Sequence, residues 1–346
     1  MKKTKLIERF SALLFSLTLA SAPLSAADSK GLLVCVSTPD VESLVREIGG
    51  DRVRVVSFSS GPEDPHEIEL KPSYVKALNQ ADLYVQVGLG IENAWLKGLF
   101  NTVKSDAVKP GGAGNLNLGA GVTPLEGEQG KAIPESYHEE GNPHYLLDPL
   151  EGYKAARAIA RKLGELQPNQ TRNFNARLDK FREKLATALL GAECAEDDPV
   201  EVAQEFAEAA VRGKLDALLR KHEIGGWLKR SLPFRGTSIV GDHDLWPYFA
   251  RRYGLEILGY LEPSPGVPPT TRHLRKMIGE MKAKDVKVIL TAPYFDPKHA
   301  RFVNRNTGAV VVPTVHQTGG RPGTGTYLEM LEHNFNAVFS ALEQSK

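Results

Sequence analysis

Apolar positions along the chain follow two periods, and the alternation of these periods predicts alternating strands and helices. Short apolar runs that suit buried strands lie at residues 31–36, 53–58 and 83–87. A helix-period pattern at residues 41–48, ended by Gly49-Gly50, follows the first run, and another at residues 73–79 follows the second. Strands and helices joined by short connections are typical of a parallel sheet with helices on both faces.

The second half of the chain repeats this alternation. Further strands are predicted at residues 238–240, 255–258, 286–290 and 310–312, and helices at residues 271–282, 295–304 and 327–342. Between the halves, a helical pattern runs from residue 150 to residue 190, interrupted near Gln167-Pro168-Asn169. We therefore expect an α/β fold of two lobes, each with a parallel-rich sheet flanked by helices, joined by a long backbone helix.

The predicted organisation has five parts. They are a signal peptide (residues 1–27), an N-terminal α/β lobe (28–150), a connecting backbone helix (151–190), a helical insertion of unknown role (191–236) and a C-terminal α/β lobe (237–346). Within the first lobe, residues 109–130 are rich in Gly and Pro and show no period.

The first 27 residues resemble an export signal. Lys2, Lys3 and Lys5 precede an apolar run over residues 10–24, and small residues follow at Ser25-Ala26-Ala27. The apolar run is too short for a membrane span. We expect cleavage after Ala26 or Ala27, which would leave an exported, soluble protein that is not embedded in the membrane.

Charge and cysteine content exclude other classes of protein. The chain has 43 basic and 42 acidic residues, and it lacks a sustained basic stripe, so nucleic acid is not an expected partner. Two cysteines are too few for a disulfide scaffold. Cys35 has the context of a buried strand thiol, and we expect no bridge to Cys194. We also expect a monomer.

Three histidines share one sequence context. His66, His144 and His243 each lie after a strand or turn and before a helix, in the connections where open α/β sheets place ligands. Pro65 and Pro143 directly precede the first two and stiffen the backbone there. Three imidazoles with one further ligand suit Zn²⁺. Spacing alone leaves convergence open, since a loop histidine is often a bystander.

Carboxylates near these histidines could accept the second ring N–H and fix the tautomer. The candidates are Asp64, Glu67, Asp148, Asp242 and Asp244. Four other histidines lie on helical patterns beside charged residues, and we expect them to be solvated: His222, His273, His299 and His333. His138, with Glu139 and Glu140, is interpreted as part of an acidic surface loop.

The order of these motifs resembles the metal-specific periplasmic binding proteins of ABC importers, the group that carries zinc and manganese. The first-lobe signature is Asp64-Pro65-His66, Leu70-Lys71-Pro72-Ser73, Ala81-Asp82-Leu83, Gly88-Leu89-Gly90-Ile91-Glu92 and Trp95-Leu96. The second and third ligand loops are residues 142–149 and 242–255. The resemblance covers essentially the whole chain after the signal peptide. It implies metal ligands at His66, His144 and His243 and lobes joined by a backbone helix.

Two positions depart from that family. Its fourth ligand is commonly an Asp after the strand that here spans residues 310–312, whereas this chain continues Pro313-Thr314-Val315-His316-Gln317. His316 and a water molecule are therefore both candidates for the fourth ligand. The family's frequent Glu before Pro293-Tyr294 is Ala292 here.

The resemblance implies a binding protein that captures a divalent metal ion between two lobes and delivers it to the membrane permease of an ABC importer. Imidazole-rich sites suit Zn²⁺, while Mn²⁺ prefers carboxylate oxygens, so we expect Zn²⁺ as the transported ligand. The alternatives are a manganese- or iron-binding member of the same family and an exported three-His zinc hydrolase. The chain has neither an H-E-x-x-H motif nor a nucleophile elbow, and we do not expect an enzyme.

Overall fold

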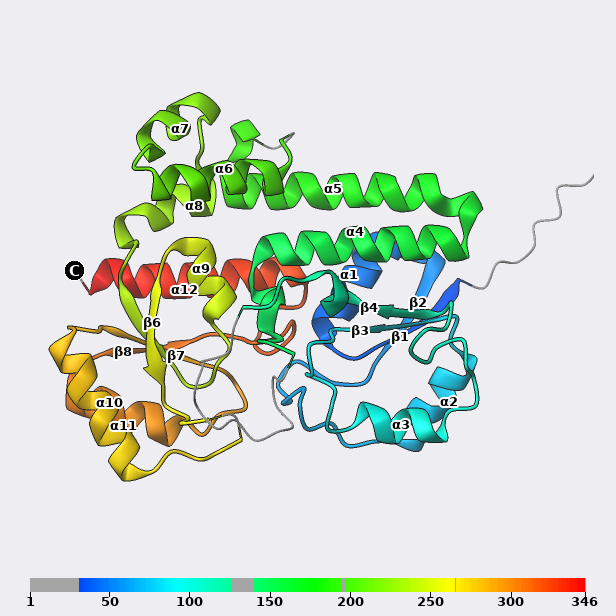
Figure 1. Cartoon of the computed structure of the whole chain (residues 1–346), viewed down its shortest axis with the longest axis horizontal. Coiled ribbons are helices and arrows are strands. Elements are labelled where there is room, and N and C mark those ends of the chain that lie inside the picture. Colours follow the sequence, from blue (N-terminus) through cyan, green and yellow to red (C-terminus); the bar gives the residue numbers. More distant parts are fainter. Residues whose placement is uncertain (1–30, 126–139, 195–196, 265, 346) are drawn as a thin grey trace, which may run out of the picture. The chain divides into compact units, whose positions relative to one another are not determined.

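A computed structural model describes residues 31–125, 140–194, 197–264 and 266–345 (Figure 1). The predicted signal peptide and His138-Glu139 lie outside these ranges. Within them, no helix is both long enough and apolar enough to cross a membrane.

The N-terminal lobe is built on a four-stranded parallel sheet of order β2-β1-β3-β4. Its strands are β1 (Leu32–Val36), β2 (Val53–Ser57), β3 (Leu83–Gln86) and β4 (Asn115–Asn117). Its helices are α1 (Pro39–Gly49), α2 (Pro72–Gln80) and α3 (Leu96–Thr102). β4 lies in the stretch for which the sequence predicted no regular element, because its residues Asn-Leu-Asn carry no apolar pattern.

Side chains of β1 alternate between two apolar layers. Val34 and Val36 pack in the core that contains α1, while Cys35 packs on the other face with Leu78 of α2 and Leu99 of α3. This two-residue alternation is the periodicity of a strand covered on both faces. Cys35 and Cys194 are both buried and free.

The C-terminal lobe repeats the design, with a four-stranded parallel sheet of order β6-β5-β7-β8. Its strands are β5 (Ser238–Gly241), β6 (Glu256–Tyr260), β7 (Val288–Thr291) and β8 (Val310–Pro313). Its helices are α9 (Pro247–Tyr253), α10 (Thr271–Ala283), α11 (Pro297–Thr307) and α12 (Tyr327–Gln344). The predicted α/β class with two parallel sheets is therefore confirmed.

The predicted connecting helix over residues 151–190 is two helices. α4 (Pro149–Leu166) ends before Pro168, and α5 (Thr171–Leu190) returns alongside it in the opposite direction (Figure 1). Pro168 cannot donate the backbone hydrogen bond that a continuous helix needs there. α5 packs against α1 of the N-terminal lobe and against α8 (Gly226–Ser231) of the insertion. Phe181 of α5 also contacts the ring of Tyr327 in the C-terminal lobe. The insertion also contains α6 (Pro199–Val211) and α7 (Leu215–His222).

The loop after β8 packs directly against the N-terminal lobe. The buried carboxylate of Asp40 in α1 accepts hydrogen bonds from the backbone N and the Oγ1 of Thr318, each at 2.7 Å. Burial raises the pKa of Asp40 to about 6, although these two donors act to lower it. A Cβ atom at Gly61 would collide with the backbone of Gly319 and Gly320, so these two segments of the chain approach as closely as a glycine permits.

Candidate metal centre

Three histidines from separate connections meet in one cluster. His66 follows β2, His144 begins the short 3₁₀ helix His144–Leu147, and His243 follows β5. One ligand atom of each lies within 4.8 Å of the others. The three residues are 3%, 7% and 4% exposed, so the cluster is buried. The convergence that the sequence left open is present in the structure.

The ring geometry suits a single tetrahedral ion. The ring centroids are 5.3 Å apart for His66 and His144, 5.9 Å for His66 and His243, and 5.6 Å for His144 and His243. A tetrahedral ion about 2.0–2.1 Å from one nitrogen of each ring would hold the centroids roughly 5.4 Å apart. The observed triangle is close to that arrangement without any further adjustment of the backbone.

His66 is positioned by its own loop. Asp64 Oδ1 accepts hydrogen bonds from the backbone N of His66 at 2.9 Å and from its Nδ1 at 2.8 Å. Trp95 Nε1 donates to the carbonyl oxygen of Pro65 at 3.1 Å and anchors the loop. Although burial acts to raise it, the hydrogen bond and the charge of His66 lower the pKa of Asp64. A carboxylate on Nδ1 places the proton there and directs the Nε2 lone pair to a metal.

His144 is positioned by contacts that cross between the lobes. Asn142 Oδ1 accepts a hydrogen bond from the backbone N of His144 at 2.9 Å. Asn142 Nδ2 donates to the carbonyl oxygen of Asp244 at 2.8 Å, and Tyr248 donates its hydroxyl to the carbonyl oxygen of Asn142 at 3.0 Å. The loop that carries His144 is therefore bonded to the loop that carries His243.

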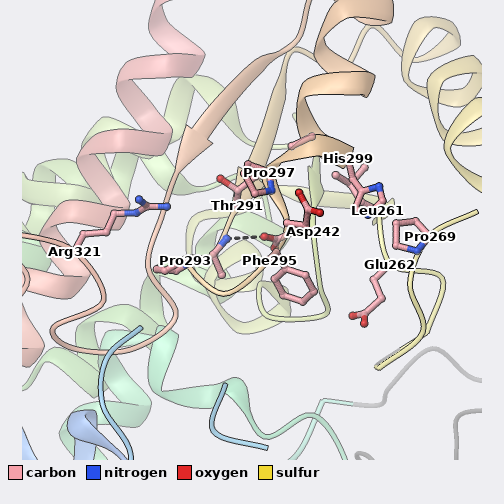
Figure 2. Close-up of a pocket in the computed structure, with 13 residues that line it drawn as sticks. Asp242, Leu261, Glu262, Pro269, Thr291, Pro293, Phe295, Pro297, His299 and Arg321 are labelled. Carbon is pink, nitrogen blue, oxygen red and sulfur yellow. Dashed lines mark hydrogen bonds between the residues drawn. The ribbon is translucent and has the colours of Figure 1, made fainter. Parts of the chain in front are cut away.

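His243 is fixed at its backbone and at its ring. Asp242 accepts hydrogen bonds from the backbone N of His243 at 2.9 Å and from the backbone N of Ala292 at 2.6 Å, the second drawn in Figure 2. The ring Nδ1 contacts the carboxylate of Glu262. Burial, with the nearby charge of His66, lowers the pKa of His243 to about 3, which keeps the imidazole neutral as a metal requires. Burial raises the pKa of Asp242 to about 8 and that of Glu262 to about 7.

Of the five carboxylates proposed as ring partners, Asp64 takes that role toward His66. Asp242 instead accepts hydrogen bonds from the backbone N–H groups of His243 and Ala292. Asp148 caps α4 through the backbone N of Leu150 at 2.9 Å. Its two oxygens also accept from Nε and Nη2 of Arg252, each at 2.8 Å. This buried bidentate ion pair joins the helix after His144 to the helix after His243. Glu262, which contacts the ring of His243, was not among the candidates, because its sequence Glu-Pro-Ser-Pro-Gly predicts only a turn.

His316 is buried beside the cluster but is not a member of it. Its Nε2 lies 2.9 Å from the carbonyl oxygen of Glu63 and 2.8 Å from Nε2 of Gln317, which also donates to Glu63. Burial lowers the pKa of His316 to about 4. His316 and Gln317 thus hold the backbone just before Asp64-Pro65-His66.

The four histidines expected to be solvated are half-buried. His222 lies 3.1 Å from a carboxylate oxygen of Glu205, and His273 and His333 approach the carbonyl oxygens of Tyr260 and Pro313 at 2.9 and 3.0 Å. His299 lines two cavities next to the cluster. None of the four belongs to the histidine cluster.

Several cavities lie at or beside the cluster, and two of them share Glu262. One, of about 220 Å³, is lined by His66, His243, Glu262 and His299 among others. The other, of about 200 Å³, lies within the C-terminal lobe, and Figure 2 shows Asp242, Glu262, Phe295 and Arg321 around it. Glu262 borders both cavities.

A family model described as "Zinc-uptake complex component A periplasmic" matches residues 34–189 and 207–341. The unmatched residues 190–206 begin at the last residue of the predicted backbone helix and otherwise fall in the predicted helical insertion. Among curated relatives, the manganese-binding lipoprotein MntA of Halalkalibacterium halodurans is 23% identical over 327 residues, covering 92% of this chain and 91% of its own.

Two solved structures show the same fold. A crystal structure of ZnuA has a TM-score of 0.64 at 24% identity and covers 91% of this chain and 98% of its own. The binding protein FpvC of Pseudomonas aeruginosa in complex with Mn²⁺ has a TM-score of 0.69 at 22% identity, with 92% and 100% covered. The family consists of substrate-binding proteins rather than enzymes, so the hydrolase alternative is not retained. The chain belongs to the family of the periplasmic component A of zinc-uptake complexes, the divalent-metal-binding proteins of ABC transporters.

Proposed function

We propose that this protein captures Zn²⁺ between its two lobes and delivers it to the membrane permease of an ABC importer. The observation that carries the proposal is the cluster of three buried imidazoles, which contains no carboxylate among the described residues. Imidazole nitrogens favour Zn²⁺, whereas Mn²⁺ is better served by carboxylate oxygens.

The proposed ligands are His66, His144 and His243, with water in the fourth position. The alternative fourth ligand is His316. Its Nε2 is engaged with Glu63 and Gln317, which supports a role in holding the loop of His66. Its buried Nδ1 has no hydrogen-bond partner among the described residues, so this nitrogen keeps His316 a candidate ligand. A site with three protein ligands and one water is a common arrangement for Zn²⁺.

Manganese is the second candidate, because the curated relatives include proteins named as manganese-binding. FpvC is also described in complex with Ni²⁺, so the fold accommodates several divalent ions. Specificity must then come from the ligand atoms of each chain. Here the cluster has nitrogen donors only, which supports zinc.

Export is part of the same proposal. The signal-like segment over residues 1–27, with cleavage after Ala26 or Ala27, would place the mature protein in the periplasm as a monomer. There it would meet the permease.

Equilibrium competition on metal-free protein tests the choice of metal. Zn²⁺ and Mn²⁺ are titrated separately against chelators of known affinity, with thermal unfolding followed in parallel. We expect Zn²⁺ to bind at least about 100-fold more tightly than Mn²⁺. A metal at 100 times its Kd should add about 2.7 kcal/mol to stability, and the chelator should remove that gain. Stronger binding of Mn²⁺ would contradict the proposal.

A further inference from the structure

Glu262 is a partly buried glutamate beside the histidine cluster. It lies two residues after the end of β6, and its side chain is 9% exposed. Its backbone N donates to the carbonyl oxygen of Asp242 at 2.9 Å, which holds it beside the loop of His243. Its carboxylate contacts Nδ1 of His243 and borders both cavities of the site.

A short turn follows Glu262 and lines the same cavity. Gly266 has a φ of 74°, and Ser264 and Val267 form a β-bridge that closes the turn. The backbone N–H of Val267 donates to the carbonyl oxygen of Ser264 at 3.0 Å. Glu262 and Gly266 both border the cavity beside His66 and His243.

We propose that Glu262 is the positioning residue for His243 and that it contributes to the selection of a divalent cation. This inference rests on the proposed metal-binding function. By accepting a hydrogen bond from Nδ1–H, the carboxylate sets the tautomer of His243 and turns Nε2 toward His66 and His144. Partners of this kind typically change metal affinity 10- to 100-fold.

Charge supports the second part of the inference. The three imidazoles are neutral ligands, so a buried divalent ion would bring two positive charges into the cluster. Asp64 beside His66 and Glu262 beside His243 place one carboxylate group next to each of these two ligands. Two carboxylate groups just outside a neutral ligand set favour a divalent cation over a monovalent one.

Two substitutions separate hydrogen bonding from charge. Glu262→Gln keeps an oxygen that can accept from Nδ1 but removes the charge, while Glu262→Ala removes both. The matched control is Glu256→Gln, an exposed glutamate on β6. We expect Zn²⁺ affinity, measured by chelator competition, to fall about 10-fold in the Gln variant and up to about 100-fold in the Ala variant. The control should match the wild type.

Two further measurements exclude a general loss of structure. The melting temperature of each metal-free variant should stay near that of the wild type. The visible absorption of the Co²⁺-loaded Ala variant should shift, because it reports the ligand geometry. A loss of Zn²⁺ affinity in the Ala variant alone would show that Glu262 acts through its hydrogen bond. A loss in both variants would show that its charge contributes as well.

Zn²⁺ affinities of both variants within about twofold of the wild type would overturn the inference. A fall in affinity matched by an equal fall in the stability of the metal-free protein would overturn it as well. Failure of the proposed function would look different, because wild-type protein would then bind no metal, or binding would survive replacement of His243.

Discussion

The two lobes present their metal-facing histidines in different ways. In the N-terminal lobe, His66 and its carboxylate partner Asp64 are two residues apart in one loop that Pro65 stiffens. In the C-terminal lobe, His243 meets Glu262 across 19 residues, and the two lie at the ends of neighbouring strands β5 and β6. The first pair is a property of the local sequence, and the second is a property of the sheet.

This difference has a physical consequence for the site. The Asp64 pair needs only one loop conformation, so it should form wherever that loop is anchored. The Glu262 pair needs the correct register between β5 and β6, which contains an irregularity between Ile239 and Val240. The C-terminal half of the site therefore depends more strongly on tertiary structure.

The largest effect is expected from removal of a ligand in either lobe. His66→Ala and His243→Ala should each weaken Zn²⁺ binding by a factor on the order of 1,000, because each removes one of three metal–nitrogen bonds. Chelator competition measures both, and His222→Ala, distant from the cluster, is the control. A weak effect in only one of the two variants would show that a single lobe holds the ion.

Removal of the local carboxylate should have a smaller effect. Asp64→Ala should lower Zn²⁺ affinity about 10- to 100-fold, since His66 loses the acceptor on Nδ1 and the loop loses a backbone contact. Asp64→Asn keeps an acceptor oxygen and should lose less. Comparison with Glu262→Ala in the same competition assay ranks the two lobes. If Asp64→Ala behaves like wild-type protein, local positioning of His66 is unnecessary.

Replacement of His316 distinguishes a ligand from a support. His316→Ala should weaken Zn²⁺ binding only about fivefold, the equivalent of one hydrogen bond of about 1 kcal/mol to the Glu63 carbonyl. Gln317→Ala should act similarly, because it donates to the same oxygen. Calorimetric titration gives both affinities. A loss for His316→Ala near that of His66→Ala would instead identify His316 as the fourth ligand.

The smallest effect concerns the contact between the lobes at Asp40. Burial raises the pKa of Asp40 in the folded protein to about 6, above its usual value of 3.8. Between these two pH values the folded protein holds a proton that the unfolded chain has released, so the free energy of unfolding falls as pH rises through this window. Asp40→Asn removes the buried charge and keeps an acceptor for Thr318. It should raise the unfolding free energy by on the order of 1 kcal/mol at pH 8 and by less at pH 5.

Thermal unfolding at the two pH values measures the effect of Asp40→Asn. Asp51→Asn, at an exposed position after α1, serves as the control. An equal change at both pH values would mean that the charge of Asp40 is not what the substitution relieves.

The parallel sheets were predictable from local signals in the sequence, whereas the convergence of the three histidines was predicted from the resemblance to a metal-binding family. Apolar runs such as residues 83–87 specify a buried strand by themselves, and Pro65 and Pro143 mark constrained loops. β4 was not predicted, because the three-residue edge strand Asn115–Asn117 has no apolar pattern of its own and is defined only by its pairing with β3. Glu262 escaped detection because its role depends on strand pairing, while its own sequence specifies a turn.

The roles of Asp148 and of the helical segment show the same limit. A carboxylate four residues after His144 was a reasonable partner for its ring. The oxygens of Asp148 instead accept hydrogen bonds from Arg252 and from the first turn of α4. The interruption at Pro168 was visible, yet the reversal of α5 against α4 arises from packing of their apolar faces.

The Asp148–Arg252 ion pair also bears on how fast an ion can leave. It joins the segments that carry His144 and His243, and breaking a buried pair of this kind typically costs 3–5 kcal/mol. A route of release that separates these segments has to break this ion pair as well as the metal–nitrogen bonds. We therefore expect the ion pair to lengthen the time for which a captured ion stays bound.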